Sequence, residues 1–207
     1  MAEENLTSRL EAFCDGVFAI ALTLLIIDIR FPSSETINNT SDFWLALKHI
    51  SPAIFAFVLS FIVILITWVN HHAFLKLVNK ASSSFLYANG FLLLTVVFVP
   101  FPTSLIGEYV LTDHAGPAVF LYDAVTAIQG LAWVLLAGAA IGNRLTKNEH
   151  STAQMLVSRR NGYFAFTAYS LLAILALWFP LTIAAVTTLT WIFWLIFGIN
   201  IHHGKGQ

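Results

Sequence analysis

The sequence contains very little charge. Only 10% of its 207 residues are Asp, Glu, Lys or Arg, whereas 58% are hydrophobic. A soluble domain carries roughly 25% charged residues, so a surface this poor in charge suits lipid and not water. The net charge of −1 lacks the basic excess that nucleic-acid binding requires. We therefore expect an integral membrane protein surrounded by a lipid bilayer, with no nucleic-acid partner.

The sequence also contains few of the residue patterns on which enzymes and metal proteins depend. Its single cysteine, Cys14, excludes an intramolecular disulfide and a cysteine-based zinc site. No HExxH or similar metal-binding spacing occurs, and no nucleophile, base and orienting group form a recognisable set. Glu3 and Glu4 precede Arg9, unlike the basic start of a secretory signal. We expect no enzyme activity, no cofactor and no metal.

Long hydrophobic runs, in contrast, are abundant. A helix needs about 20 mostly apolar residues to cross the bilayer, and six runs meet this length. They predict an all-α, polytopic membrane protein with a single domain over residues 1–207. Pro100 and Pro102 interrupt the third run, and segment 42–50 is predicted to be a short amphipathic helix on the membrane surface. The six predicted spans are residues 10–29, 51–72, 84–106, 117–141, 163–180 and 183–201.

Lysine and arginine favour one side of these spans. Cytoplasmic segments of membrane proteins carry an excess of both residues, and a cytoplasmic N-terminus places most of them inside. Arg30 and Lys48 are then the two cations of the outer segments. Both termini are predicted to be cytoplasmic. The inner cations are Arg9, Lys76, Lys80, Arg144, Lys147, Arg159, Arg160 and Lys205.

The first span begins with polar residues. Arg9, Glu11 and Asp15 lie in its first turns, and a charged residue within a membrane is costly enough to be functional by default. Arg9 and Glu11 are equally consistent with a position among the lipid headgroups. Asp15 lies deeper, so it is predicted to have a buried partner.

One stripe of the first span is apolar. At 100° per residue, Phe13, Ile20, Leu24 and Ile27 share a narrow face, which Gly16 and Thr23 flank and at whose edge Asp28 lies. Such a stripe packs against another helix or lipid in most proteins. It is equally the composition of a pore that filters ions by dewetting, and periodicity alone does not choose between the two.

The second span ends in Trp68-Val69-Asn70-His71-His72. Paired histidines bind metal or haem, relay protons, or hydrogen-bond to a buried carboxylate. Adjacent helical residues point 100° apart, so both histidines cannot easily bind one metal. A structural role is therefore favoured. Because the pair lies at the depth of Asp15, pairing of Asp15 with one histidine is predicted.

Three motifs together resemble the transmembrane protein 175 family. Arg9-x-x-x-Phe13-Cys14-Asp15 is similar to the RxxxFSD signature of its first helix, with Cys14 in place of serine. The WxNHH run at 68–72 and the NG…PFPT pattern at 89–103 are also similar to that family. The resemblance covers essentially the whole chain. Because a thiol hydrogen-bonds more weakly than a hydroxyl, a contact that depends on the serine is expected to be weakened or lost.

The resemblance implies a potassium-permeable channel of a single six-helix repeat, forming a homotetramer around a central pore in a prokaryotic plasma membrane. The first helix would line the pore, with Ile20, Leu24 and Ile27 as the constriction and Thr23 as a polar contributor to selectivity. Asp28 could concentrate monovalent cations at the outer mouth. The remaining motif residues would hold the pore helix in place: Arg9, Phe13, Cys14, Asp15, Trp68, Asn70, His71 and His72.

Two other functions compete with a channel. A proton- or ion-coupled transporter could use Asp15 with His71 or His72 as a titrating relay. A membrane oxidoreductase could bind haem through one of the same histidines, but no obvious second axial ligand occupies another span.

Overall fold

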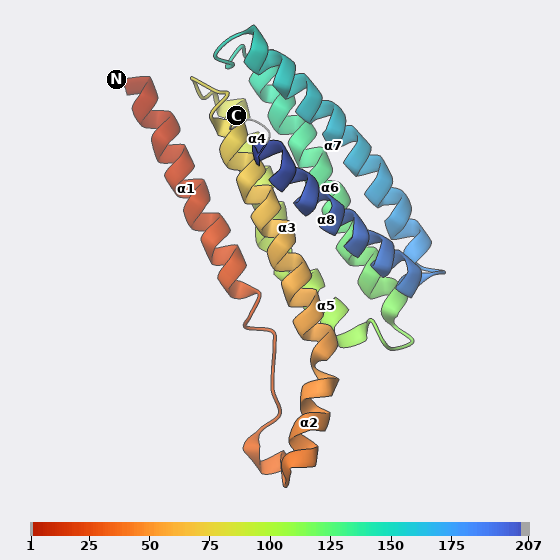
Figure 1. Ribbon diagram of the computed structural model, residues 1–207. Helices are drawn as coiled ribbons and strands as arrows, with labels where there is room; N and C mark the ends of the chain where they lie inside the picture. The colour runs from red at the N-terminus through yellow and green to blue at the C-terminus, as the bar shows by residue number, and fades with distance from the viewer. Residues whose placement is uncertain (1, 204–207) are drawn as a thin grey trace.

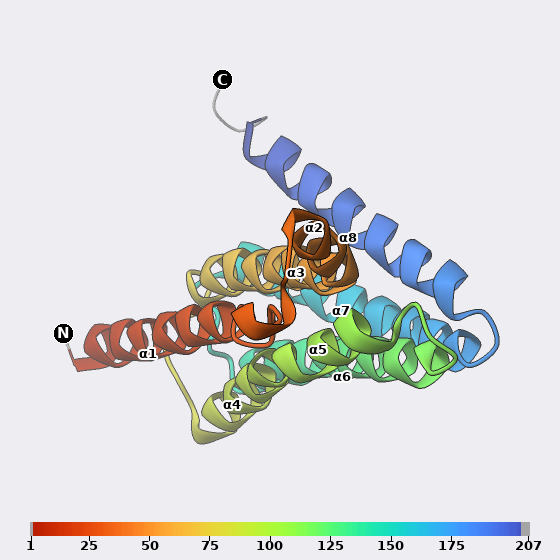
Figure 2. The same ribbon diagram turned by 90° about the horizontal axis from the view of Figure 1, so that it is seen from below.

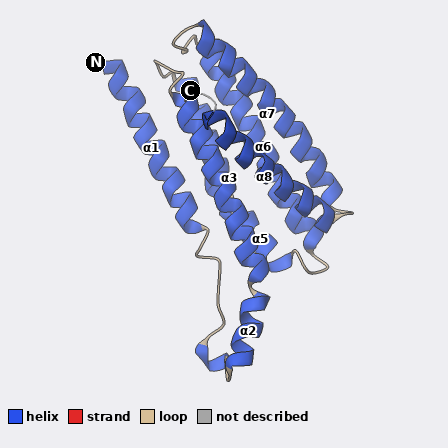
Figure 3. Ribbon diagram, in the orientation of Figure 1, coloured by secondary structure: helices blue, strands red, loops and turns tan. Residues whose placement is uncertain are grey.

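The computed structural model describes the backbone of residues 2–203 and the side chains of residues 8–195. Within these residues the fold is all-helical, as predicted (Figure 3). A 3₁₀ turn at Ser34–Thr36 accompanies the α-helices. The α-helices are α1 (Ala2–Leu24), α2 (Thr40–His49), α3 (Ser51–Leu75), α4 (Ser83–Phe98), α5 (Pro100–Tyr109), α6 (Ala115–Gly142), α7 (Glu149–Ala176) and α8 (Pro180–His203).

The long helices run side by side, with α1 at one edge of the molecule and α7 and α8 towards the other (Figures 1 and 2). Helix α2 confirms the short helix predicted near residues 42–50. It projects beyond the end of α3 (Figure 1), and its position on the membrane surface stays a prediction. The beginning of α1, the α3–α4 connection and the α6–α7 connection lie at one end of the molecule (Figure 1). Four of the predicted inner cations, Lys76, Lys80, Arg144 and Lys147, lie in these two connections, whereas Lys205 lies outside the described residues. Which side this end faces stays a prediction.

Three stretches of the described chain are long and apolar enough to cross a membrane: Ser51–Leu75, Ser83–Tyr109 and Ala115–Gly142. Pro180–Leu195 is a shorter apolar stretch. Each of the six predicted spans coincides with a helix or, for the third, with the pair α4–α5. The total of six membrane crossings stays a prediction.

The third predicted span is interrupted, as expected from its prolines. Ser82 caps α4, accepting a hydrogen bond from the Phe85 amide at 3.3 Å. The helix ends at Phe98, and α5 begins at Pro100, where a missing N–H costs no helical hydrogen bond. The two helices together form one stretch of 27 residues.

The first helix ends earlier than predicted. α1 stops at Leu24, and the Ile27 amide donates to the Leu24 carbonyl at 3.1 Å in a tightened turn. The following Phe31-Pro32 favours an extended chain, because proline disfavours helical conformation in the residue before it. The predicted helical span 10–29 is therefore wrong at its end. Ile27 and Asp28 follow the helix, so the 100° rule does not describe them.

The fifth helix begins 14 residues before its predicted start at residue 163, since α7 starts at Glu149. Asn148 caps it by accepting a hydrogen bond from the Ser151 amide at 2.8 Å. A hydropathy criterion misses this polar first half, which contains Arg159 and Arg160. These arginines lie in a helix and not in a connection. α8 likewise begins at Pro180, three residues before its predicted start.

Two glycines explain why α7 lies so close to α6. A Cβ atom on Gly130 would lie 2.8 Å from the Phe166 amide nitrogen, and one on Gly162 would lie 2.9 Å from the Gly130 carbonyl oxygen. The two backbones therefore meet at a distance that a larger side chain would prevent. Small residues allow this kind of approach between membrane helices.

Candidate functional site

One face of α1 anchors the helix to the rest of the protein. Cys14, Phe18, Ala21 and Leu25 recur at spacings of four, three and four residues and are at most 2% exposed. They belong to one apolar cluster with residues of α3, α4 and α6, among them Ile64. This face fixes which side of α1 points away from the bundle.

The predicted apolar stripe lies about 120° around α1 from this buried face, and a single chain leaves most of it exposed. Phe13 is 63% exposed, Ile20 58%, Leu24 37% and Ile27 63%. Thr23 is also exposed, and its hydroxyl donates to the Ile20 carbonyl at 2.9 Å. Ile27 continues the exposed stripe although it lies beyond the helix. The face that the sequence periodicity identified is therefore largely uncovered by the described residues of one chain, least so at Leu24.

Two polar contacts join α1 to α3. The Trp68 indole donates to Asp15 Oδ1 at 2.8 Å, and Glu11 Oε1 lies 2.8 Å from His72 Nδ1. Each helix contributes residues one turn apart, and the two helices run in opposite directions, so position 11 meets 72 where position 15 meets 68. Asp15 therefore has Trp68 as its partner in place of the predicted histidine, and Glu11 is the carboxylate beside His72.

A third contact is buried and connects α1, α3 and α4. His71 Nε2 lies 2.7 Å from Asn89 Oδ1, and the Asn89 amide donates to Cys14 Sγ at 3.2 Å. An amide oxygen only accepts hydrogen bonds, so Nε2 carries the hydrogen. The thiol therefore occupies the signature serine's position and accepts a bond, so the contact is present. That it is weaker than a contact to serine stays a prediction. The Phe18 ring packs beside His71 at 5.4 Å.

Other predicted motif residues lie apart from these contacts. Arg9 and Asn70 are exposed, and neither bonds to the described network within one chain. Asp28 is exposed in the turn after α1. The Nε2 atom of His71 is occupied by Asn89, which removes it as a haem ligand in this arrangement. Among the side chains described, no group of three or more His, Cys, Asp or Glu residues could hold a metal ion.

Asn89 is the residue of this network whose role the sequence did not reveal. The sequence showed it only as part of the Asn89-Gly90 motif, and no bonding partner was predicted for it. A depth count could have found it: His71 lies five positions from Lys76 at the end of α3, and Asn89 lies seven positions from Ser82 at the start of α4. Residues at similar distances from one connection lie at similar depth.

Comparison with known proteins places the chain. A family model described as endosomal/lysosomal potassium channel TMEM175 matches residues 9–100. A potassium channel of Chamaesiphon minutus is 40% identical over 158 residues, covering 76% of this chain and 72% of the relative.

The chain belongs to the TMEM175 family.

Other members agree with this assignment. A potassium channel of Streptomyces collinus is 40% identical over 133 residues, covering 64% of this chain and 63% of its own length. The crystal structure of a lysosomal potassium-selective channel TMEM175 homolog from Chamaesiphon minutus superposes with a TM-score of 0.76 at 32% identity. That match covers 93% of this chain and 99% of the homolog. All the polar contacts of α1 lie inside the segment that the TMEM175 family model matches.

A second polar cluster lies mostly beyond that matched segment, with Ser60 as its one member inside residues 9–100 among those named here. Asp123 of α6 is fully buried and accepts a hydrogen bond from Thr187 of α8 at 2.9 Å. Tyr122 contacts the Ser60 hydroxyl at 3.1 Å, and Thr103 donates to Ser60 at 2.7 Å. The sequence did not establish the depth of Asp123. The apolar residues on both sides of it in α6 were the available signal.

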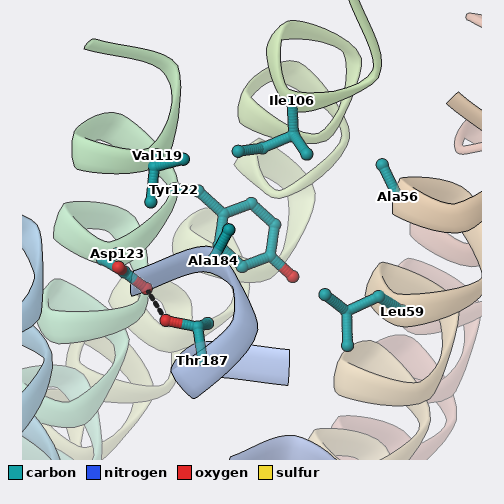
Figure 4. Close-up of a pocket in the computed structure, with 8 residues that line it drawn as sticks. All are labelled: Ala56, Leu59, Ile106, Val119, Tyr122, Asp123, Ala184 and Thr187. Atoms are coloured by element: carbon teal, nitrogen blue, oxygen red, sulfur yellow. Dashed lines mark hydrogen bonds between the residues drawn. The ribbon is translucent and has the colours of Figure 1, made fainter. Parts of the chain in front are cut away.

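The cavity beside Asp123 is too small to conduct ions (Figure 4). Its volume is about 20 Å³, and one water molecule needs at least roughly 10–15 Å³. Figure 4 shows Asp123 and Thr187 joined at one side and Tyr122 reaching between α6 and α3. The cavity therefore belongs to the helix packing of this TMEM175 family member. It is lined by Ala56, Leu59, Ile106, Val119, Tyr122, Asp123, Ala184 and Thr187.

Proposed function

We propose that this chain forms a potassium-permeable cation channel, a homotetramer in which α1 of each subunit lines a central pore. The observation that carries the proposal is the contrast between the two faces of α1. One face is held by apolar packing and three polar contacts, whereas the other presents a continuous apolar stripe. The bacterial relatives are potassium channels by name, which supports potassium as the permeant ion.

The exposed stripe suits a pore shared between copies of the chain. Ile20 and Leu24 point away from the bundle on successive turns, so symmetry-related copies would place rings of branched aliphatic side chains around an axis. Such rings exclude water and limit conduction without any charged filter. Ile27 would add a third ring at the end of the helix.

Polar groups near the stripe would modulate selectivity. Thr23 is exposed beside Ile20, and although its hydroxyl hydrogen is engaged, its oxygen lone pairs remain able to face a cation. Asp28 follows the helix end with an exposed side chain, where a carboxylate would raise the local cation concentration at the outer mouth.

The polar contacts behind α1 would keep the pore helix from rotating. Asp15, Cys14 and Glu11 each face a partner on α3 or α4, and a rotation of α1 by one residue would break all three contacts. In this role they position the constriction and do not touch the ion. Phe13, Arg9 and Asn70 remain exposed in one chain and are candidates for contacts between subunits.

We also propose the domain organisation, membrane topology and location of the protein. The chain is an integral membrane protein of a channel family, and we propose one channel domain over residues 1–207 with six crossings. Both termini would be cytoplasmic, in a prokaryotic plasma membrane. The channel would be passive, with no enzyme activity and with permeant potassium in place of any cofactor.

A coupled transporter is the alternative. It would need Asp15 and the histidines to exchange protons, yet Asp15 accepts its bond from Trp68, and His71 contacts Asn89. His72 faces Glu11 and not Asp15, so the described contacts do not join Asp15 to either histidine, and we favour the channel.

The test is ion flux through purified protein in liposomes, with potassium and sodium compared under matched gradients. Wild type should pass potassium faster than sodium without a proton gradient. Ile20→Asn should raise flux or reduce selectivity, because a polar ring hydrates the constriction. Ile192→Asn is a matched control, since Ile192 is an exposed apolar residue of α8.

Unchanged currents in Ile20→Asn would remove Ile20 from the pore. Flux that appeared only with a proton gradient would replace the channel with the transporter.

A further inference from the structure

Two connections at the end where α1 begins are joined to each other. Residues 76–82 link α3 to α4, and residues 143–148 link α6 to α7; we call them the paired connections. The Asn79 amide donates to the Leu145 carbonyl at 3.0 Å, and the Lys147 amide donates to the Leu77 carbonyl at 3.0 Å. These bonds form an antiparallel bridge. The paired connections therefore hold two distant segments in one defined arrangement.

The inner side of the paired connections is anchored in the protein core. Val78 is 2% exposed and Leu145 is 5% exposed, and both pack in the cluster that contains Phe85 and Met155. Arg144, beside Leu145, has a φ of 53°. This is the left-handed backbone conformation, which glycine adopts at no steric cost and arginine adopts only at a steric cost. The anchoring gives the cations of this unit a fixed location.

The outer side of the paired connections is positively charged. Lys76, Arg144 and Lys147 are exposed, and Lys80 is a fourth cation on the same unit. Neither connection contains an aspartate or glutamate. Within the described residues, Lys76, Arg144 and Lys147 form no salt bridge, and the exposed carboxylate of Glu149, which follows the second connection, pairs with none of them. The charge of these three side chains is therefore available to an outside partner.

The position of the paired connections indicates which kind of partner binds these cations. Lys76 follows the last residue of α3, and Arg144 lies two residues after the end of α6. Both helices are apolar enough to cross a membrane, so their ends lie where hydrocarbon gives way to headgroups. Clusters of lysine and arginine at this level attract anionic lipids.

We propose that the paired connections bind the phosphodiester headgroup of an anionic phospholipid. Arg144 supplies a planar donor set that matches phosphate oxygens, and Lys76 and Lys147 supply point charges. The bound lipid ties the α3–α4 connection to the α6–α7 connection, at the opposite end of α1 from Asp28. This inference requires a membrane protein but not ion conduction, so it stands or falls separately from the channel.

The experiment measures lipid binding to the full chain, purified in a neutral detergent, by native mass spectrometry and thermal unfolding. Phosphatidylglycerol, phosphatidylcholine and inorganic phosphate are the three probes. Phosphatidylglycerol should remain bound and raise Tm, whereas the other two should do neither at matched concentration. Affinity should fall about fivefold for each cation removed, since one cation contributes about 1 kcal/mol near an anionic surface.

The test variant is Lys76→Gln/Arg144→Gln/Lys147→Gln, which should bind phosphatidylglycerol about a hundredfold more weakly. The matched control is Arg30→Gln/Lys48→Gln, which removes exposed cations from the other end and should bind as wild type does. A control that also lost about fivefold per removed cation would show general charge attraction and overturn the site. Equal binding of phosphatidylcholine would also overturn it, and equal binding of inorganic phosphate would replace the lipid with a free anion.

A second measurement needs no variant. Raising the salt concentration should release phosphatidylglycerol from wild type, because salt screens exposed charges. Lipid retention that ignored salt would place the lipid on an apolar surface and contradict the proposal, even if the triple variant did not fold.

Discussion

The α1–α3–α4 side of the molecule and the α6–α7 pair are held together by different means. Besides apolar packing, α1 meets α3 and α4 through polar side chains, Asp15 with Trp68 and Cys14 with Asn89. α6 and α7 instead meet backbone to backbone at Gly130 and Gly162. Polar contacts have direction and specify one rotation of a helix, whereas glycine contacts specify distance. The proposed pore helix thus has a defined rotation, whereas α6 and α7 have a defined separation.

The largest effect is expected where the two backbones touch. Gly162→Leu should lower the free energy of unfolding by about 3 kcal/mol, because overpacking a site without space forces the helices apart. Thermal unfolding in detergent measures the change. Gly138→Leu in α6 is the control, since a Cβ there meets nothing within 4 Å. Equal stability of both variants would mean that α6 and α7 can separate freely.

A smaller effect is expected from the buried polar contact. Asn89→Leu should cost about 1–3 kcal/mol, because it leaves the buried His71 without its partner. Potassium flux should change as well, since α1 loses one of the contacts that set its rotation. Asn161→Leu is the matched control, since Asn161 is an exposed residue of α7. If Asn89→Leu unfolded and conducted as wild type does, the contact would have no positioning role.

The smallest effect is expected at Cys14. Cys14→Ser replaces a weak sulfur acceptor with a hydroxyl and should change stability by about 0.5–1 kcal/mol, the scale of one neutral hydrogen bond. The Asn89 bond should shorten from 3.2 Å towards the usual oxygen distance. A crystal structure of the variant and its unfolding temperature together measure this. An Asn89 that turned away from the serine would show that the thiol contact is incidental.

Sequence reasoning succeeded where one physical quantity decides the structure. Apolar length predicted the helices, because a chain in lipid must satisfy its own backbone hydrogen bonds. It failed for the first half of α7, where polar residues such as Arg159 and Arg160 continue a helix whose other face packs on α6. It also extended α1 to Ile29, since apolar residues continue past Leu24, where the helix ends.

The candidate site also contains one feature that the sequence predicted and one that it did not. The stripe of Phe13, Ile20 and Leu24 follows from helical geometry alone, and the structure leaves it exposed. The partner of Asp15 did not follow from helical geometry. Asp15 and the histidines of α3 lie at similar depth, which made a histidine a possible partner. The antiparallel register of α1 and α3 instead brings Trp68 to Asp15 and His72 to Glu11.

What the sequence determined by itself is the environment and the local periodicity: a lipid-embedded helical chain with one apolar stripe on its first helix. Composition and spacing decide these features because each depends on residues close together in the chain. The tertiary structure alone decided that Asn89 joins Cys14 to His71, that Asp123 is buried against Thr187, and that the paired connections meet. Each of these contacts joins distant segments, and their register depends on the packing of every helix between them.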